Sequence, residues 1–195
     1  MTVENTNEEI IQQDRQYENI TFEEKILKNR VFIKCSFHKS SLKGCTFENS
    51  VFEDCVFDDC DISLMKFKDT SFSNVTLKNC KAIGVLWVET NNPFSINCTN
   101  TRLSFCSFYS KSLKKSKFVN CIADEVDFSE CNLAGADFTG TDLRNARFLN
   151  CDLSKANFVG ALNYFIDARS NKISKARFSL PEALSFLTAL DIELE

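Results

Sequence analysis

The sequence predicts a solenoid, because an apolar residue returns at every fifth position over most of the 195 residues. We call this residue the centre of each quintet. The series begins at Phe22, runs to Trp87, slips by one residue, resumes at Leu103 and continues to Phe158. A period of five is neither the 3.6 of a helix nor the 2.0 of a strand. Self-similarity at a short fixed period is typical of repeat architectures.

A second inward position lies two residues before each centre, and small side chains occupy it. Ser, Thr, Ala and Val are frequent there, and Cys98 is the one cysteine of ten that stands elsewhere. The other nine are Cys35, Cys45, Cys55, Cys60, Cys80, Cys106, Cys121, Cys131 and Cys151. Acidic residues fall at the remaining three positions, as expected if those face water, since a buried carboxylate without a partner is costly.

The cysteines are predicted to be buried small hydrophobes rather than disulfides or metal ligands. The sequence has no CxxC pair, and the spacings are multiples of five that the repeat itself sets. A free cysteine packs well in an apolar interior. No metal site is therefore expected.

Three quintets, 136–140, 141–145 and 151–155, resemble the A(D/N)LXX motif of the pentapeptide-repeat family, and the resemblance extends from about Ile20 to Phe178. It implies an all-β solenoid, a right-handed quadrilateral parallel β-helix in which four quintets make one coil. Residues twenty apart would then stack at about 4.8 Å, the spacing of neighbouring strands. The repeats correspond to about seven coils.

Three segments follow from this frame: a polar segment over 1–19, the β-helix over 20–178 and a C-terminal module over 179–195. Residues 1–19 are either a cap or disordered, and the sequence does not decide between them. Near 88–98 the frame is interrupted at an Asn-Pro turn signal. The interruption is either a neutral corner insertion or a partner-contacting loop, with Asn91, Asn92, Pro93 and Phe94 as its candidate residues.

The C-terminal module changes period. Ser179 and Glu182 have the spacing of a capping box, followed by apolar residues on one helical face. We expect a helix that covers the open end of the stack and a short terminal strand. By resemblance to the quinolone-resistance members of the family, this module implies a homodimer held by Leu184, Leu187, Leu190, Ile192 and Leu194.

Several function classes are disfavoured. No stretch approaches the roughly 20 apolar residues of a membrane span, and the polar N-terminus has no signal-peptide pattern, so a soluble cytoplasmic protein is predicted. The single histidine, His38, stands at an outward position, and no phosphate loop, HExxH or EF-hand pattern occurs. We therefore expect a non-enzyme without cofactor or small-molecule substrate.

In length and capping the chain is similar to the Qnr, MfpA and McbG types of the family. That similarity implies a DNA-mimicking rod that binds DNA gyrase and topoisomerase IV and protects them from quinolone-type inhibitors, without binding nucleic acid itself. An acidic rod would be steered toward a cationic partner. The alternative is a scaffold that binds another cytosolic protein through its faces, loop or ends.

Charge does not decide between these two functions. The net charge of −4 is modest, and many acidic residues have a basic residue twenty positions away, as Glu48 has Lys28 and Lys68. Four acidic residues lack such a counterpart and are the candidate partner-binding residues of the acidic faces: Glu53, Glu125, Glu130 and Asp142.

Overall fold

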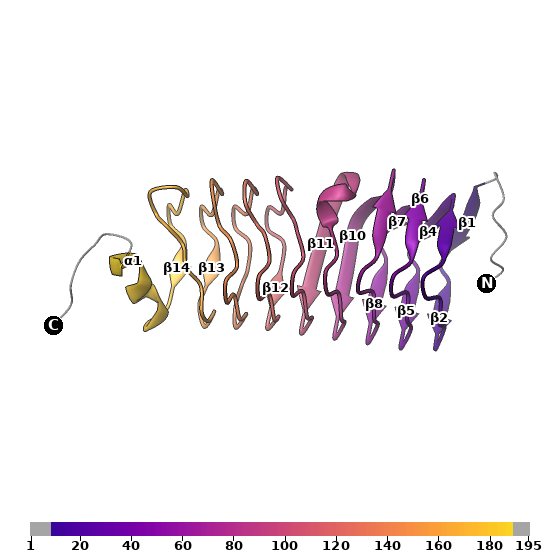
Figure 1. The fold of residues 1–195 in the computed structure, drawn as a ribbon, viewed down its shortest axis with the longest axis horizontal. Coiled ribbons are helices and arrows are strands. Elements are labelled where there is room, and N and C mark those ends of the chain that lie inside the picture. The colour runs from indigo at the N-terminus through magenta and orange to yellow at the C-terminus, as the bar shows by residue number, and fades with distance from the viewer. Residues whose placement is uncertain (1–8, 189–195) are drawn as a thin grey trace.

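The structure is a computed structural model that describes residues 9–188, and it is a right-handed four-sided parallel β-helix (Figure 1). Paired strands are parallel and join residues twenty apart, as Phe32 is paired with Phe52. The solenoid has about eight coils, one more than predicted. At about 4.8 Å per coil, the rod is roughly 35–40 Å long.

Four sides, named A to D, follow one another around each coil. Side A is a column of single bridges that joins Thr21, Ser41, Asp61, Lys81, Arg102, Ile122, Asp142 and Leu162. Side B contains β3 (Ile26–Lys28), β6 (Thr46–Glu48) and β9 (Lys66–Lys68), then the bridged residues Leu86, Ser107, Asp127 and Arg147.

Sides C and D carry the longer strands. Side C contains β1 (Ile10–Gln13), β4 (Arg30–Ile33), β7 (Val51–Glu53), the start of β10 (Ser71–Lys78) and of β11 (Asn91–Thr99), and the bridged residues Ser112, Asn132, Asp152 and Lys172. Side D contains β2 (Gln16–Glu18), β5 (Ser36–His38), β8 (Val56–Asp58), the ends of β10 and β11, β12 (Phe118–Val119), β13 (Asn157–Phe158) and β14 (Arg177–Phe178).

The β-helix begins about ten residues earlier than predicted. Strand β1 pairs with β4, and β2 pairs with β5, in the same twenty-residue register as the later coils. The Tyr17 ring stacks on Phe37 with the centroids 4.9 Å apart, which extends the aromatic column to the first coil. Residues 10–19 therefore belong to the solenoid, and the rest of the predicted N-terminal segment, 1–8, lies outside the described residues.

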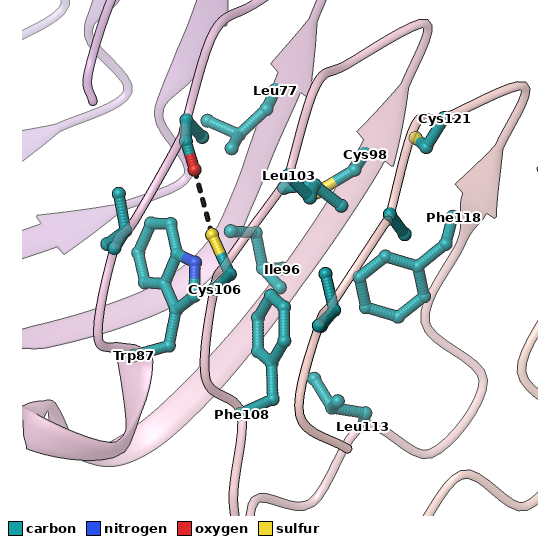
Figure 2. Packing of buried hydrophobic residues seen from close by; sticks show 14 of the residues in the cluster. Leu77, Trp87, Ile96, Cys98, Leu103, Cys106, Phe108, Leu113, Phe118 and Cys121 are labelled. Carbon is teal, nitrogen blue, oxygen red and sulfur yellow. Dashed lines mark hydrogen bonds between the residues drawn. The ribbon is translucent and has the colours of Figure 1, made fainter. Parts of the chain in front are cut away.

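The predicted core is confirmed, with centres and small positions both buried. Centres stack along the axis, as Phe52 does between Phe32 and Phe72 with centroids 5.0 and 4.6 Å away. All ten cysteines are buried free thiols. Several donate a hydrogen bond to a carbonyl of the coil below; the dashed line in Figure 2 marks the one from Cys106 Sγ to the Ala82 oxygen, 2.8 Å. A small side chain with a weak donor suits this position.

The corners have a left-handed backbone that the sequence interpretation missed. The residue two after each centre usually has φ near +50 to +70°. All five glycines stand at this position, with φ between +67 and +71°. Asn and Asp are frequent there too, because they tolerate this region better than other non-glycine residues.

The one-residue slip consists of two register shifts. Ser71 and Phe72 of β10 are adjacent, but their partners in β11 are Asn91 and Phe94. Strand β11 therefore has two additional residues at this point. One residue is then lost before Val75, which is paired with Ile96. A 3₁₀ turn, Trp87–Glu89, precedes the shift and lies at the edge of the rod (Figure 1). Beyond it, Cys98 takes a centre position between Leu77 and Phe118 (Figure 2).

The C-terminal end is closed by a 3₁₀ turn, Glu182–Leu184, and one turn of helix, α1 (Ser185–Thr188). Phe186 covers the last coil, with its ring 4.7 Å from that of Phe178. The predicted capping box is wrong, because no side chain caps the turn and the Ser179 hydroxyl instead accepts a hydrogen bond from the Gly160 N–H at 2.9 Å. The predicted terminal strand lies beyond residue 188, outside the described residues.

Candidate partner-binding surface

Many carboxylates on the rod have a structural role. An Asp or Asn directly before a centre accepts a hydrogen bond from the backbone N–H two residues later, as Asp137 does from Thr139 at 3.0 Å. The same turn is made by Asp61, Asp127, Asn132, Asp142, Asp152, Asn157 and Asp167. Side-chain acceptors of this kind stabilise tight turns. The D/N of the sequence motif is thus explained by the corner it forms.

The structure does not bring the four predicted acidic residues together. Glu53 is exposed on side C, and Glu125 and Glu130 are exposed at the two edges of side B, at opposite corners. Asp142, on side A, has no basic residue twenty positions away, but it accepts hydrogen bonds from the Arg144 N–H (3.2 Å) and the Asn163 amide (2.8 Å). Its carboxylate also lies 3.5 Å from the Arg144 guanidinium. The Asp142 carboxylate is therefore already bound by neighbouring groups of the rod.

Cross-coil ion pairs are fewer than the stacking predicted. Lys28 contacts Glu48 at 2.8 Å and holds the pKa of that carboxyl below its usual value. Within residues 9–188 the other predicted lysine–carboxylate and arginine–carboxylate pairs are not in contact, and Asp54 and Asp58 instead accept from the amides of Asn74 and Asn79. Acidic and basic residues still stand in the same columns. They therefore reduce the net electrostatic potential of each side without forming ion pairs.

The predicted loop is only partly on the surface. Asn91, Asn92 and Pro93 are exposed, but Phe94 is buried and is a core residue rather than a contact residue. Its ring packs 5.9 Å from that of Trp87, and the Lys111 ammonium lies 5.1 Å above it. Phe94 points inward because the two added residues place it opposite Phe72, at a centre position of the core.

Lys111 is an exception to the rule of small inward residues. It stands two residues before Leu113, its side chain is almost completely buried, and its ammonium donates to the Thr90 carbonyl oxygen. Burial lowers the pKa of Lys111. The coil after the bulge thus accommodates a long side chain where the coils on either side of it hold Thr90 and Cys131.

An apolar surface that the sequence interpretation did not single out extends across side B from its corner with side A. We call it the corner patch: Leu64, Leu86, Val88, Phe105 and Tyr109, each between 39 and 52% exposed. Leu64 packs over Gly84, where an added Cβ would meet the leucine at 2.9 Å, and Phe105 is one coil further along the same corner. A shallow pocket of about 160 Å³ opens between Leu64 and Leu86.

The patch carries a conformational cost. Leu64 and Phe105 have φ of +57° and +61°, although bulky side chains are rare in the left-handed region. At other corners this position holds glycine, asparagine, aspartate, serine or a charged residue, none of which exposes a large apolar side chain. Strained residues cluster at binding sites more often than elsewhere. Two large apolar residues kept at unfavourable, solvent-exposed corners therefore indicate a contact surface.

Charged residues surround the corner patch. Glu125 lies one coil beyond Phe105, and Glu130 lies beside the Tyr109 hydroxyl and raises its pKa. Lys66 lines the small pocket, and Lys68 follows it on β9. Two of the four predicted acidic residues therefore border the patch, and an apolar centre with a charged rim is typical of protein interfaces.

Nothing in residues 9–188 suggests catalysis. The described chain contains no group of three or more His, Cys, Asp or Glu side chains placed to hold a metal ion. His38 is half-buried, with its Nδ1 atom 4.0 Å from the Asp58 carboxylate. No helix in this part of the structure has the length and apolarity to cross a membrane.

Of the predicted dimer residues, two can be placed. Leu184 is 45% exposed and Leu187 is half-buried at the C-terminal end. Leu190, Ile192 and Leu194 lie outside the described residues. The dimer stays a prediction.

Comparison with family models identifies the architecture. A model of pentapeptide repeats in nine copies matches residues 32–76, and a model of a pentapeptide repeat region matches residues 95–162, together more than half of the chain. The chain belongs to the pentapeptide-repeat family. No curated protein sequence is significantly similar to it.

Solved pentapeptide-repeat structures share the fold over nearly their whole length. A trypsin-treated form of QnrB1, a plasmid-mediated fluoroquinolone resistance protein, has a TM-score of 0.67 at 20% identity, over 93% of this chain and 99% of that one. Full-length QnrB1 has a TM-score of 0.58 at 18% identity, over 91% of this chain and 100% of that one. HetL is involved in regulation of heterocyst differentiation in the cyanobacterium Nostoc sp. strain PCC 7120. It has a TM-score of 0.58 at 13% identity, over 88% of this chain and 86% of that one.

Proposed function

We propose that this pentapeptide-repeat protein binds a type II topoisomerase, DNA gyrase or topoisomerase IV, and protects it from quinolone-type inhibitors. The observation that carries the proposal is the agreement with the fold of QnrB1 over 93% of this chain and 99% of that one. Both proteins are rods of similar length, so they present their sides to a partner in a similar way. Fold alone does not specify a partner, and the contacts must come from the surface.

The corner patch and its acidic rim are the contact surface in this proposal. Leu64, Phe105 and Tyr109 supply the apolar area, and Glu125 and Glu130 supply charge toward a cationic enzyme. This differs from mimicry of DNA by a uniformly acidic rod. Because acidic and basic residues share columns on each side, long-range attraction is weaker than a net acidic surface would give.

The alternative is a scaffold that binds a different protein by the same patch. HetL, of similar fold, is described as a regulator of heterocyst differentiation rather than of drug resistance. The apolar character of the patch favours a protein partner in both cases, and it does not by itself select the topoisomerase. Only assays with the enzymes separate the two functions.

The test is DNA supercoiling by purified gyrase, and decatenation by topoisomerase IV, with ciprofloxacin and increasing amounts of the protein. Recovery of activity at low micromolar protein supports the proposal. The double variant Leu64→Glu/Phe105→Glu should abolish the recovery, whereas Ile26→Glu, 49% exposed on side B away from the patch, should not. Absence of any effect on either enzyme would leave the scaffold function.

Charge is tested separately in the same assay. Glu125→Gln/Glu130→Gln should weaken protection several-fold at low salt and less at high salt, because rim charges act mainly on association. Protection that collapses with salt to the same extent in the wild type and the double variant would point to acidic residues elsewhere on the rod.

A further inference from the structure

Side C of the C-terminal half has a surface opposite in sign to the net charge of the chain. Five exposed lysines gather there, which we call the lysine strip: Lys114, Lys115, Lys155, Lys172 and Lys175. The chain as a whole has a formal net charge of −4. The strip is thus a local reversal of charge on an acidic protein.

The register places the five lysines on one side over four successive coils. Lys172 ends the bridged column of Ser112, Asn132 and Asp152. At the adjacent corner the Lys115 N–H bonds to Ala134 and the Lys155 N–H to Ser174, so Lys115, Lys155 and Lys175 belong to one column. With coils about 4.8 Å apart, this column extends over roughly 14 Å.

The positive charge of the strip is not neutralised by contact pairs. None of the five lysines forms an ion pair with another described residue. Asp152 is the carboxylate on this stretch of side C, and its pKa is lowered first by the Ser154 hydrogen bonds and then by Lys172 and Lys114. Glu130 and Asp137 border the strip, but Lys117 and Arg177 stand in the same column as Asp137.

The rest of the strip is polar, and a shallow hollow of about 460 Å³ opens along it beside Asn132, Asp152 and Lys172. Between the lysines lie Ser112, Asn132, Ala134, Gly135, Ser154 and Ser174. The Lys115 side chain passes over Gly135, where an added Cβ would lie 3.6 Å from the lysine Cγ. No side chain stands between Lys115 and Lys155 in this column. No side chain larger than alanine provides an apolar anchor.

These properties select the class of partner. Protein interfaces are built around a buried apolar centre with aromatic residues, and the strip has none. Lysine, serine and asparagine are among the side chains that contact phosphate oxygens and sugars. A duplex presents one phosphate per 3.4 Å along each strand, so the column of roughly 14 Å faces about four phosphates.

We propose that the lysine strip binds the phosphate backbone of duplex DNA without regard to sequence. This reverses the expectation, drawn from the sequence, that the protein binds no nucleic acid. It does not depend on the corner patch, whose apolar residues lie on side B and at its corner with side A. A rod with both surfaces could hold a protein on one side and DNA on another.

The experiment measures fluorescence anisotropy of a labelled duplex of about 20 bp with the full-length protein at about 20 to 200 mM salt. Counterion release by four phosphate contacts predicts a slope of log affinity against log salt of about −3 to −4. Weak, non-specific binding, with a Kd of about 10⁻⁴ to 10⁻⁶ M, is the expected range.

Two matched charge reversals test the location. Lys155→Glu/Lys175→Glu should weaken binding at least about tenfold and flatten the slope by about 2. Lys66→Glu/Lys68→Glu changes the net charge equally on side B and should act much less. All four lysines are exposed, so the thermal midpoints should match the wild type.

Three outcomes would overturn the proposal. One is no anisotropy change at the lowest salt with protein at about 100 μM, well above the expected dissociation constant. The second is an equal effect of the two double variants, which would make binding a matter of net charge. The third is competition by polyglutamate as strong as by unlabelled duplex at equal charge, which would assign the strip to an acidic protein segment.

Discussion

Replacement of Phe138 by alanine tests whether the aromatic columns stabilise the β-helix. Phe138 is fully buried on side D. Its ring stacks between Phe118 and Phe158, with centroids 5.3 and 4.8 Å away, and meets Phe128 and Phe148 edge-on at 5.5 and 5.9 Å. A buried Phe→Ala change costs about 3–5 kcal/mol, and each aromatic pair adds about 0.5–1.5 kcal/mol beyond buried area.

With four ring partners lost at once, we expect Phe138→Ala near the upper end, a loss of about 4–5 kcal/mol. In urea, with an m value of about 2 kcal/mol/M, the unfolding midpoint should fall by about 2 M. Far-UV circular dichroism follows the transition. The control is Phe105→Ala, an exposed phenylalanine of the corner patch, for which we expect a change of at most about 0.5 kcal/mol.

Equal midpoints for the two variants would refute the placement of Phe138 inside the column. A large loss for Phe105→Ala and a small one for Phe138→Ala would invert the assignment of inward and outward positions along the whole chain. Coils contact only their neighbours, so a two-step transition confined to the Phe138 variant would still agree with the argument.

Three further outcomes are expected. Lys111→Ala should lower the free energy of unfolding by about 1–3 kcal/mol, because the Thr90 carbonyl loses its donor inside the bulge, and equal stability in urea would contradict this role. Burial raises the pKa of Cys55, Cys106 and Cys131 to about 12, whereas unfolded thiols ionise near 8.5. Stability should therefore be flat below about pH 8 and fall as the pH rises from about 8.5 toward 12, since the unfolded chain releases protons first; a midpoint unchanged from pH 7 to 10 would exclude buried thiols. For the predicted dimer, Leu184→Asp should halve the mass measured by light scattering, Leu149→Asp on side B should not, and a monomeric wild type would exclude the dimer.

Most of the fold could be predicted because the repeat displays its own packing rule. Centres such as Phe57 and small residues such as Cys131 recur in a fixed frame, and steric exclusion inside a narrow coil makes that frame visible in a single sequence. The twenty-residue register came instead from resemblance to the family. The left-handed corners also have a sequence signal, since Gly44, Gly84 and Gly135 share one position of the quintet.

The candidate site was harder to predict because it depends on register across the slip. Leu64, Phe105 and Tyr109 could each be recognised as apolar residues at outward positions. The sequence does not show that these residues are close together. Neighbours on either side of the slip are 21 rather than 20 residues apart, as Leu86 is paired with Ser107. The lysine strip lies entirely beyond the slip, and its members follow the ordinary register.

The slip itself argues against a neutral insertion. A corner insertion would add one residue and leave the flanking pairs intact, but here two are added before Phe94 and one is removed before Ile96. The exchange places a phenylalanine in the column and leaves room for the buried side chain of Lys111. Deleting Pro93 alone would therefore not regularise the coil: it would draw Asn92 toward the centre position. We expect the deletion to lower the thermal midpoint, and a midpoint equal to or above that of the wild type would show that the bulge is dispensable.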